Sequence, residues 1–380
     1  MTRARVVFLI DALRPYGAER VALDLAAAMQ QTVDITMVTY KGDPQINASH
    51  VPDGVAHIHL GSRSRRFRRL VVTAHSFWRL LRQTRPTAII SFMPYANTVA
   101  AACGALVHVP VIATEHTVMS IAEYGGRERP LLHLAMRWYL RRVPAIVGVS
   151  QTVSRDLVDA FGARPERVST IYNPLDKARI LESARRGAGA IPSPLTTDEV
   201  RVVVVGRLKE AKGHEYALSA LAGLPPWFRL YVVGDGPLLD TLQKQAHALG
   251  IVDRVVFVGW QADAPAWLQA ADIVWVPSLW DGFGLVLAEA CALGRKVIPS
   301  AAPGLAEVAD NLGCATVPPR DSKALAEATL RLHATTTTPP VPRWLDELEP
   351  AAVAARYLAV VSRCTGVELR RAEYPNSPHG

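Results

Sequence analysis

Residues 280–289 combine the residue types and the spacing that bind a phosphorylated ligand. They join an apolar run over 273–278, which predicts a buried strand, to a helical pattern that begins at Leu285. Glycines at this corner allow backbone amides at the helix N-terminus to face an anion. Asp281 precedes the corner, and Glu289 follows about one and a half turns into the helix, because one turn takes about 3.6 residues. A nucleoside diphosphate sugar fits such a site, with amides for its phosphates and one carboxylate each for a sugar and a ribose hydroxyl.

Two cations follow a second predicted strand, Val200 to Val205, in the same half of the chain. Gly206 ends this strand, Arg207 comes next, and Lys212 opens the following helix. Arg and Lys together are the usual means of holding a diphosphate without a metal, since Arg offers a bidentate fork and Lys a point charge. Each motif alone has an ordinary structural explanation, a helix cap or a solvated loop. Two such motifs together favour phosphate binding.

Length and composition indicate two folded domains. The chain has 380 residues, of which 49% are hydrophobic and 20% charged, and these values are typical of a globular protein. No apolar run reaches the roughly 18 residues that a membrane span needs, and the first residues lack the pattern of a signal peptide. The four cysteines have neither metal-binding nor disulfide spacing. We therefore expect a cytoplasmic protein with reduced thiols and without a metal site.

The net charge of +8 is concentrated in the first half of the chain. Residues 1–195 hold 25 Lys and Arg against 14 Asp and Glu, whereas residues 196–380 hold 17 against 20. The basic half predicts an anionic partner, such as a phosphorylated acceptor, a lipid head group or the inner face of a membrane, and no nucleic acid is expected. The run Arg63–Arg69 next to the amphipathic pattern of 66–84 is compatible with contact to an anionic membrane, but the following alternative is favoured, because a domain of this kind needs the apolar stripe to cover its sheet. The alternative is a core-facing helix with a solvated arginine edge.

Apolar periodicity predicts an α/β protein with two Rossmann-like, doubly wound parallel sheets, because short apolar runs alternate with helical patterns. The predicted strands are residues 6–10, 33–39, 56–60, 88–92, 111–114, 145–149 and 168–172, and then 200–205, 229–233, 255–258, 273–276 and 296–299. Ligands of such folds bind at the carboxyl ends of the strands, which predicts a site in the cleft between the two domains.

The predicted domain organisation follows these patterns. It consists of an N-terminal acceptor domain over 1–175, a linker without periodicity over 176–198, a C-terminal donor domain over 199–345, a helix over 350–365 that returns to the first domain, and a loose tail over 366–380.

Motifs between residues 3 and 330 resemble the retaining family-four glycosyltransferases of the GT-B fold. The similar segments are Gly206-Arg207 with Lys212-Gly213, Gly234-Asp235-Gly236-Pro237, Asp281 with Glu289, residues 15–20, Thr114-Glu115-His116, residues 148–150 and residues 171–176. Two positions depart from the family pattern. Asp281 stands where the family has a glutamate, and Tyr16 stands where it has a glycine.

The resemblance implies a role for each matching residue. The catalytic residues would be His116, Arg207, Lys212 and Asp281, with the two cations stabilising the departing diphosphate and Asp281 holding a hydroxyl of the transferred sugar. The donor would be bound by Gly17, Gly206, Arg207, Lys212, Trp260, Asp281, Gly282, Phe283, Gly284, Leu285 and Glu289. His116 would lie over the sugar, and Tyr16 would contact the acceptor. The departing phosphate would take the acceptor's proton, so no general base is implied on the opposite face. No metal and no cofactor is implied besides the nucleotide diphosphate sugar, since the sequence has no D-x-D loop.

These observations favour a retaining glycosyltransferase of the hexosyltransferase class. It would move a hexose or aminohexose from a nucleotide diphosphate sugar, expected to be UDP-linked, to a hydroxyl of a lipid-linked saccharide or of a small natural-product acceptor. A nucleotide-sugar epimerase of the same fold is the alternative, and it would act without an acceptor. A nucleotide-sugar binding protein without turnover is a third hypothesis.

Overall fold

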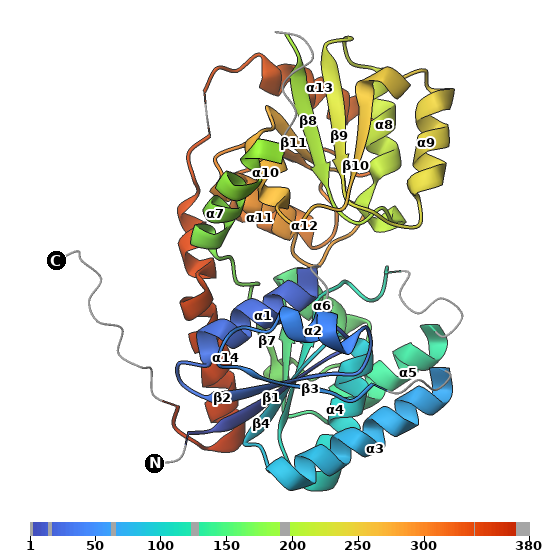
Figure 1. Cartoon of the computed structure of the whole chain (residues 1–380). Coiled ribbons are helices and arrows are strands. Elements are labelled where there is room, and N and C mark those ends of the chain that lie inside the picture. The colour runs from blue at the N-terminus through green and yellow to red at the C-terminus, as the bar shows by residue number, and fades with distance from the viewer. Residues whose placement is uncertain are drawn as a thin grey trace, which may run out of the picture. The chain divides into compact units, whose positions relative to one another are not determined.

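The computed structural model describes residues 3–13, 17–61, 66–122, 129–190, 198–337 and 339–369, without the side chains of residues 66–70 and 190. The chain divides into two units (Figure 1). The first unit is formed by Met1–Pro174 together with Leu348–Gly380, and the second unit is Leu175–Glu347. Each unit is built around its own parallel sheet.

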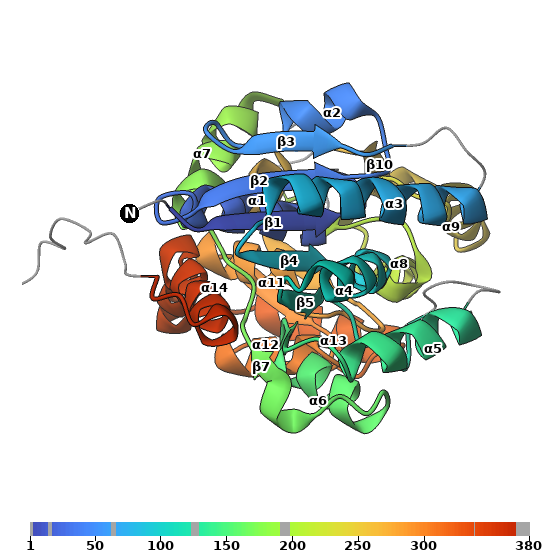
Figure 2. The same ribbon diagram turned by 90° about the horizontal axis from the view of Figure 1, so that it is seen from below.

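The first unit holds a seven-stranded sheet in the order β3-β2-β1-β4-β5-β6-β7, and Figure 2 shows β3, β2, β1, β4 and β5 side by side. Its strands are β1 (Arg5–Ile10), β2 (Asp34–Thr39), β3 (Ala56–His59), β4 (Ala88–Phe92), β5 (Val111–Glu115), β6 (Ala145–Gly148) and β7 (Val168–Thr170). Its helices are α1 (Gly17–Met29), α2 (Pro44–Ser49), α3 (Arg66–Thr84), α4 (Pro94–Val107), α5 (Arg129–Leu140), α6 (Gln151–Asp159) and α14 (Pro350–Thr365).

Both faces of the first sheet are buried, which explains the continuous apolar runs of its strands. Alternate residues of β1, namely Val6, Phe8 and Ile10, share a core with α1 and α14. Val7 and Leu9 point to the opposite face and are also buried. The C-terminal helix α14 contacts α1, so the last helix of the chain completes the core of the first unit.

The second unit holds a five-stranded sheet in the order β10-β9-β8-β11-β12. Its strands are β8 (Val200–Val205), β9 (Phe228–Val233), β10 (Val255–Gly259), β11 (Ile273–Val276) and β12 (Lys296–Pro299). Its helices are α7 (Lys177–Gly187), α8 (His214–Ala222), α9 (Leu239–Ala248), α10 (Ala264–Gln269), α11 (Leu285–Ala292), α12 (Leu305–Asn311) and α13 (Ser322–His333). Helices α8, α9 and α13 share a core with β8 and β9.

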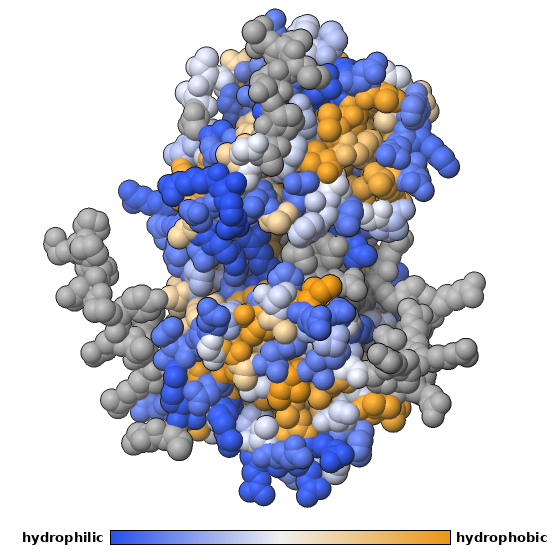
Figure 3. Space-filling model, viewed as in Figure 1, coloured by the Kyte–Doolittle hydropathy of each residue, from blue (hydrophilic) through white to orange (hydrophobic). Residues whose placement is uncertain are grey.

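The edge strand of the second sheet carries an apolar surface. All five residues of β10 are half-buried. Figure 3 shows hydrophobic side chains gathered at the upper right of the second unit, in the region of β10 and α9. The side chains of β10 are therefore more exposed than those of the central strands β8 and β11.

The predicted fold class is confirmed in both units. Every one of the twelve predicted strands has a counterpart whose bounds differ by at most two residues, and all strand pairs are parallel. The helix predicted over 66–84 is α3, with the same bounds. Alternation of strand and helix fixes this architecture, because parallel strands need a crossover connection between them.

The linker predicted over 176–198 is wrong in its first part, because Lys177–Gly187 form α7 in the second unit. The buried residues of α7 are Ile180, Ser183 and Ala184, at the helical spacing of three and four. Only one of these three is a large apolar residue. The segment is nevertheless amphipathic, and its sequence predicts a linker because it is highly charged and runs into the Gly- and Pro-containing residues 187–194.

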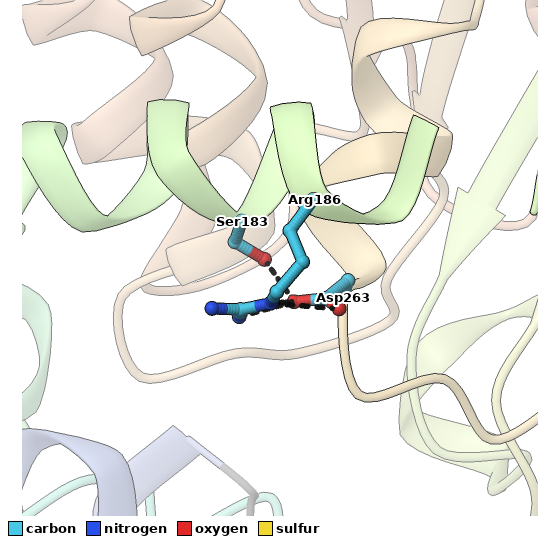
Figure 4. A network of polar contacts seen from close by, with 3 residues as sticks. All are labelled: Ser183, Arg186 and Asp263. Carbon is cyan, nitrogen blue, oxygen red and sulfur yellow. Dashed lines mark hydrogen bonds and ion pairs between the residues drawn. The ribbon is translucent and has the colours of Figure 1, made fainter. Parts of the chain in front are cut away.

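Helix α7 is attached to the second unit by a polar contact with the start of α10. Arg186 forms an ion pair with Asp263 at 2.5 Å, and Ser183 Oγ donates to the same carboxylate at 2.9 Å (Figure 4). The hydrogen bond from Arg186 lowers the pKa of Asp263. Asp176 caps the other end of α7 by accepting from the amide of Arg179 at 2.9 Å.

Three predictions fall on residues outside the described ranges. They are the acceptor contact of Tyr16, the run Arg63–Arg69 (described only as the backbone of residues 66–69) and the tail from residue 370 onward. Among the helices that are described, none is long and apolar enough to cross a membrane.

Candidate functional site

The two phosphate-binding motifs of the sequence meet at one place in the second unit. From β8 the chain continues to β9 and β10 on one side of the sheet, while β11 and β12 lie on the other side. Residues 206–212 follow β8 and residues 277–284 follow β11. The motifs therefore flank the topological switch point between β8 and β11, where open α/β sheets bind their ligands. The amide of Leu279 donates to the carbonyl of Ala211 at 2.8 Å, which joins the two segments directly.

Lys212 and Asp281 form an ion pair between the segments that follow β8 and β11. Lys212 Nζ lies 2.5 Å from Asp281 Oδ2, and the two side chains are 24% and 17% exposed. Asp281 Oδ1 accepts from the amides of Gly282 at 2.8 Å and Phe283 at 3.4 Å. Burial opposes ionisation of Asp281, but the ammonium of Lys212 and these bonds outweigh it and lower the pKa of the carboxyl. The site thus holds an ionised carboxylate beside a cation.

Two glycines allow the backbone segments of the site to approach this closely. Gly213 has φ +63°, and a Cβ there would overlap the carbonyl oxygen of Pro277. Gly304 has φ +80°, and a Cβ there would overlap the carbonyl oxygen of Asp281. Gly304 was not among the predicted site residues. Its signal in the sequence was the Pro303-Gly304 pair before a helix, which by itself predicts only a turn.

The remaining predicted donor residues lie around the N-terminus of α11. Gly284 is the N-cap residue and Leu285 the first helical residue, and the first amides of a helix have no acceptor within it. Glu289 in the same helix is buried, at 5% exposed. Phe283 is buried and its ring packs on Trp344 with centroids 6.2 Å apart, so its side chain anchors the loop.

Three other predicted donor residues lie elsewhere. Two of them are exposed residues that follow strands of the second unit, and the third belongs to the first unit. Arg207 follows β8 and is exposed. Trp260 follows β10 and is 46% exposed, so it is not a core aromatic. Gly17 is the first residue of α1 in the first unit.

His116 follows β5 in the first unit. Its Nε2 lies 3.3 Å from Thr114 Oγ1, and its ring packs on Phe92 with centroids 5.9 Å apart. Its Nδ1 is buried without a partner among the described residues. Burial lowers the pKa of His116 to about 4, so the imidazole is neutral at neutral pH and can donate from one nitrogen and accept at the other.

A buried carboxyl next to this histidine was not predicted to matter. Glu115 is the last residue of β5 and is fully buried. Its Oε1 accepts from Asn97 Nδ2 at 2.7 Å and from the hydroxyl of Tyr139, while Oε2 has no partner among the described residues. Burial raises the pKa of Glu115 to about 7 against the effect of these two bonds. A single glutamate at a strand end carries no signal in the sequence that separates it from a solvated one.

The backbone of Met93 is strained. This residue follows β4 at the switch point of the first sheet, where β1 and β4 are adjacent. It has φ 77° and ψ 153°, a region that is otherwise used almost only by glycine. Its amide donates to the carbonyl of Thr114 at 3.2 Å, and Pro94 begins α4 directly after it. Strain of this kind clusters at functional sites, which marks this edge of the first sheet as a second place of interest.

A charged cluster lies at the ends of neighbouring strands in the first unit. Lys41 and the hydroxyl of Tyr40 both contact the carboxylate of Asp11. The ammonium of Lys41 also lies 5.0 Å from the ring centroid of Tyr95. The first unit therefore offers an anion and a cation at the carboxyl edge of β1 and β2.

Metal binding has no candidate in the part of the chain that the structure describes, where no group of three or more His, Cys, Asp or Glu is arranged around one point. His214, two residues after Lys212, is buried at 2% exposed, and neither of its ring nitrogens has a partner within the described ranges. Burial, followed by the charge of Lys212, lowers the pKa of His214 to about 4.

Both halves of the chain match family models of sugar-transferring enzymes. Residues 15–179 match the model described as Glycosyltransferase Family 4, and residues 199–335 match Glycosyl transferases group 1. The chain belongs to the family-four glycosyltransferases. This membership agrees with the resemblance found in the motifs, and it leaves the epimerase alternative without support.

Solved structures of other proteins share the fold. HepE of Anabaena in complex with UDP and glucose has a TM-score of 0.74 at 20% identity, covering 95% of both chains. The glycosyltransferase WaaG, involved in lipopolysaccharide biosynthesis, has a TM-score of 0.67 at 17% identity, covering 95% of this chain and all of WaaG. The fold is therefore GT-B, as predicted.

Curated relatives are more similar in sequence but over a shorter stretch. The D-inositol 3-phosphate glycosyltransferases of Mycobacterium tuberculosis and Mycobacterium bovis are 32% identical over 210 residues. The match covers 52% of this chain and 43% of each relative, so the chain spans less than half the length of these curated relatives.

Proposed function

We propose that the chain is a retaining glycosyltransferase that moves a hexose or aminohexose from a UDP-sugar to an acceptor hydroxyl. The observation that carries the proposal is the contact between Lys212 and Asp281 at the switch point of the second sheet. It joins the cation expected to hold a diphosphate to the carboxylate expected to hold a sugar hydroxyl. The UDP and UDP-glucose complexes of HepE support a UDP-linked donor.

In the proposed reaction, the donor displaces the carboxylate of Asp281 from Lys212. Lys212 and Arg207 then hold the diphosphate, the first amides of α11 face the phosphates, and Glu289 holds the ribose hydroxyls. Asp281 accepts from a hydroxyl of the sugar, and the neutral His116 hydrogen-bonds a substrate hydroxyl. Each group is fixed before the reaction, so the developing charge is stabilised without reorganisation.

The chemical step breaks the bond between the anomeric carbon and the diphosphate oxygen. The acceptor oxygen forms its bond to the anomeric carbon on the same face, and its proton passes to the departing diphosphate. Because the leaving group takes the proton, no protein base is needed on the opposite face. Because Arg207 and Lys212 balance the charge of the diphosphate, no metal is needed. Electrostatic stabilisation of the diphosphate by Arg207 and Lys212 carries most of the rate enhancement.

For the acceptor we propose a small hydroxylated compound or a lipid-linked saccharide bound by the first unit. The cluster of Asp11 with Lys41 supports a polar or charged acceptor. We further propose a peripheral membrane contact through one face of α5, where Leu131 and Leu134 are 69% and 66% exposed and Arg137 follows three residues later. Cosedimentation with anionic vesicles at low salt tests this contact. Loss of binding in Leu131→Ser/Leu134→Ser is expected, and a protein that stays in the supernatant refutes it.

The decisive experiment on the donor is a thermal-shift panel of UDP, GDP, ADP and their sugars, with and without EDTA. A ligand at a hundredfold excess over its dissociation constant adds about 2.7 kcal/mol of stability. We expect a shift with UDP and UDP-sugars that EDTA does not change and that Arg207→Ala abolishes. Arg185→Ala is the matched control, because Arg185 is an exposed arginine of the same unit.

Turnover is then followed as UDP release with and without acceptor mixtures. Release that depends on an acceptor supports a transferase. Tight binding without release in any mixture indicates a binding protein, and no shift with any nucleotide refutes the donor site.

A further inference from the structure

Two cysteines that lie 23 residues apart in the chain meet in the second unit. Cys291 Sγ in α11 is 3.5 Å from Cys314 Sγ in the segment after α12. Cys291 is 5% exposed, whereas Cys314 is half-buried. The other two cysteines, Cys103 in α4 and Cys364 in α14, belong to the first unit. The tertiary structure thus selects one pair out of four thiols.

We propose that Cys291 and Cys314 form a dithiol site that a peroxide oxidises reversibly to an intramolecular disulfide. The sulfurs are already in contact, so closing the bond to about 2.05 Å requires a movement of about 1.5 Å. This proposal does not depend on the identity of the glycosyl donor or acceptor.

The surroundings of the pair favour reaction at Cys314. Both thiols line a cavity of about 590 Å³ together with Arg295, Lys296 and Arg331. The cavity gives a small oxidant access to the sulfurs, and the thiolate is the reactive form of cysteine. The hydrogen bond between the thiols lowers the pKa of Cys314, and the same bond together with burial raises the pKa of Cys291. Cys314 is therefore both the more acidic and the more accessible thiol.

The oxidation proceeds in two steps. The Cys314 thiolate attacks one oxygen of hydrogen peroxide, which breaks the O–O bond, gives a sulfenic acid and releases hydroxide, and the hydroxide becomes water by taking up the proton that the Cys314 thiol released on ionising. Cys291 then attacks the sulfenic sulfur, the S–S bond forms, and the hydroxyl leaves with the Cys291 proton as water. Two thiols and one peroxide thus give one disulfide and two waters.

The disulfide would tie together two helices that begin at the donor site. Helix α11 carries Glu289 two residues before Cys291. Helix α12 begins after Gly304, whose backbone lies against the carbonyl of Asp281. The bond joins α11 near its C-terminal end to the chain just beyond α12. Oxidation should therefore restrict the movement of α11 and α12 relative to each other and raise the thermal midpoint of unfolding.

The test uses the double variant Cys103→Ser/Cys364→Ser, in which only the pair remains, with the unaltered protein treated in parallel. After limited hydrogen peroxide, the intact mass should fall by the two hydrogens lost. Peptide mapping should show Cys291 linked to Cys314, the thermal midpoint should rise by several degrees, and dithiothreitol should reverse all three changes. Formation of a disulfide between two molecules, or sulfinic acid on Cys314 without a link to Cys291, would overturn the proposal.

Single variants identify the attacking thiol and guard against misfolding of the double variant. In Cys291→Ser, the sulfenic acid on Cys314 has no resolving thiol and should be trapped by dimedone. In Cys314→Ser, dimedone should label Cys291 several-fold less. Equal labelling of both variants, or complete protection of both, would contradict the assignment of Cys314 as the reactive partner.

Discussion

Asp281 in the second unit and Glu115 in the first unit are two enclosed carboxyls near the C-terminal ends of parallel strands, yet their surroundings shift their pKa values in opposite directions. Asp281 contacts the ammonium of Lys212 and two backbone amides, and the pKa of its carboxyl is lowered. Glu115 accepts only from neutral donors, Asn97 and Tyr139, and its pKa is raised to about 7. A cation beside the carboxylate therefore outweighs burial, and neutral hydrogen bonds do not.

The two carboxyls are therefore expected to act differently. Asp281 is proposed to bind a ligand directly, whereas Glu115 holds its neighbours in position. The ionised Asp281 can exchange Lys212 for a sugar hydroxyl, because both partners are partly exposed. Glu115 has no exposed atom and can act only through the residues around it, among them the neighbouring His116.

Replacing Lys212 should have the largest effect. In Lys212→Met the diphosphate loses its point charge, and kcat/KM should fall by about 10²–10³, as for removal of one donor to a developing oxyanion. The pKa of Asp281 should rise because its cation is gone. Steady-state kinetics measure the first effect, with Lys323→Met as the control, since Lys323 is 87% exposed on α13. Unchanged kinetics in Lys212→Met would remove Lys212 from the site.

Gly304→Ala should lower the free energy of unfolding of the second unit by about 3 kcal/mol. The added Cβ would overlap the backbone of Asp281, and the positive φ would strain an alanine as well. Gly313→Ala is the matched control. Gly313 has a similar φ of +68° but open space around its Cβ position, so it should cost only the strain of about 1 kcal/mol. Urea unfolding measures both. Equal losses would show that the loop carrying Asp281 is not held by this contact.

Glu115→Gln should change how stability depends on pH. The folded pKa of Glu115, about 7, lies above the ordinary value of 4.5, so its contribution is present below about pH 4.5 and is lost as the pH rises through 7. His116 and His214 act oppositely, because their folded pKa values of about 4 make stability fall as the pH drops below 6.5. Without Glu115, this histidine effect is no longer offset. Urea unfolding should then show a steeper loss on acidification from about pH 7 to about pH 5 than in the unaltered protein, by about 1.4 kcal/mol per pH unit at most.

Removing the hydroxyl of Tyr139 should have the smallest effect. Tyr139→Phe deletes one neutral donor to Glu115, which costs about 1 kcal/mol and raises the pKa of Glu115 further. Tyr231→Phe provides the comparison, because Tyr231 donates at 2.7 Å to Glu199, a carboxylate paired with Arg201 and Arg229. Bonds to charged groups are worth about 1.5–3 kcal/mol, so Tyr231→Phe should cost more. The reverse order, measured by urea unfolding, would contradict the assignment of charge states.

The sequence predicted the fold closely where burial is continuous. The strands of both sheets are short apolar runs because both sheet faces are covered, and such runs are visible without any alignment. Helix α7 escaped prediction because its charged sequence runs into the Gly- and Pro-containing residues 187–194, which are typical of a linker. Helix α2 escaped for a similar reason, since its one buried residue is the polar Asn47.

The sequence also placed the two segments predicted to bind phosphate after strands, and the structure has them after β8 and β11. It could not show that Lys212 and Asp281, 69 residues apart, contact each other. It gave no reason to single out Glu115 from other glutamates or to join Cys291 to Cys314. The roles of these residues in catalysis remain proposals to be tested by the variants above.

The sequence by itself determined the two parallel α/β units, the order of their strands along the chain and the residue types available at each strand end. These properties follow from local patterns, since apolar runs, turn residues and helix starts act over a few neighbouring positions. Only the tertiary structure decided which strand ends are adjacent, and therefore which side chains share one environment. Ionisation, hydrogen bonding and thiol contact depend on distances of a few ångströms between residues far apart in the chain. For this reason the pairing of Lys212 with Asp281, the neutral surroundings of Glu115 and the cysteine pair emerged only from the folded molecule.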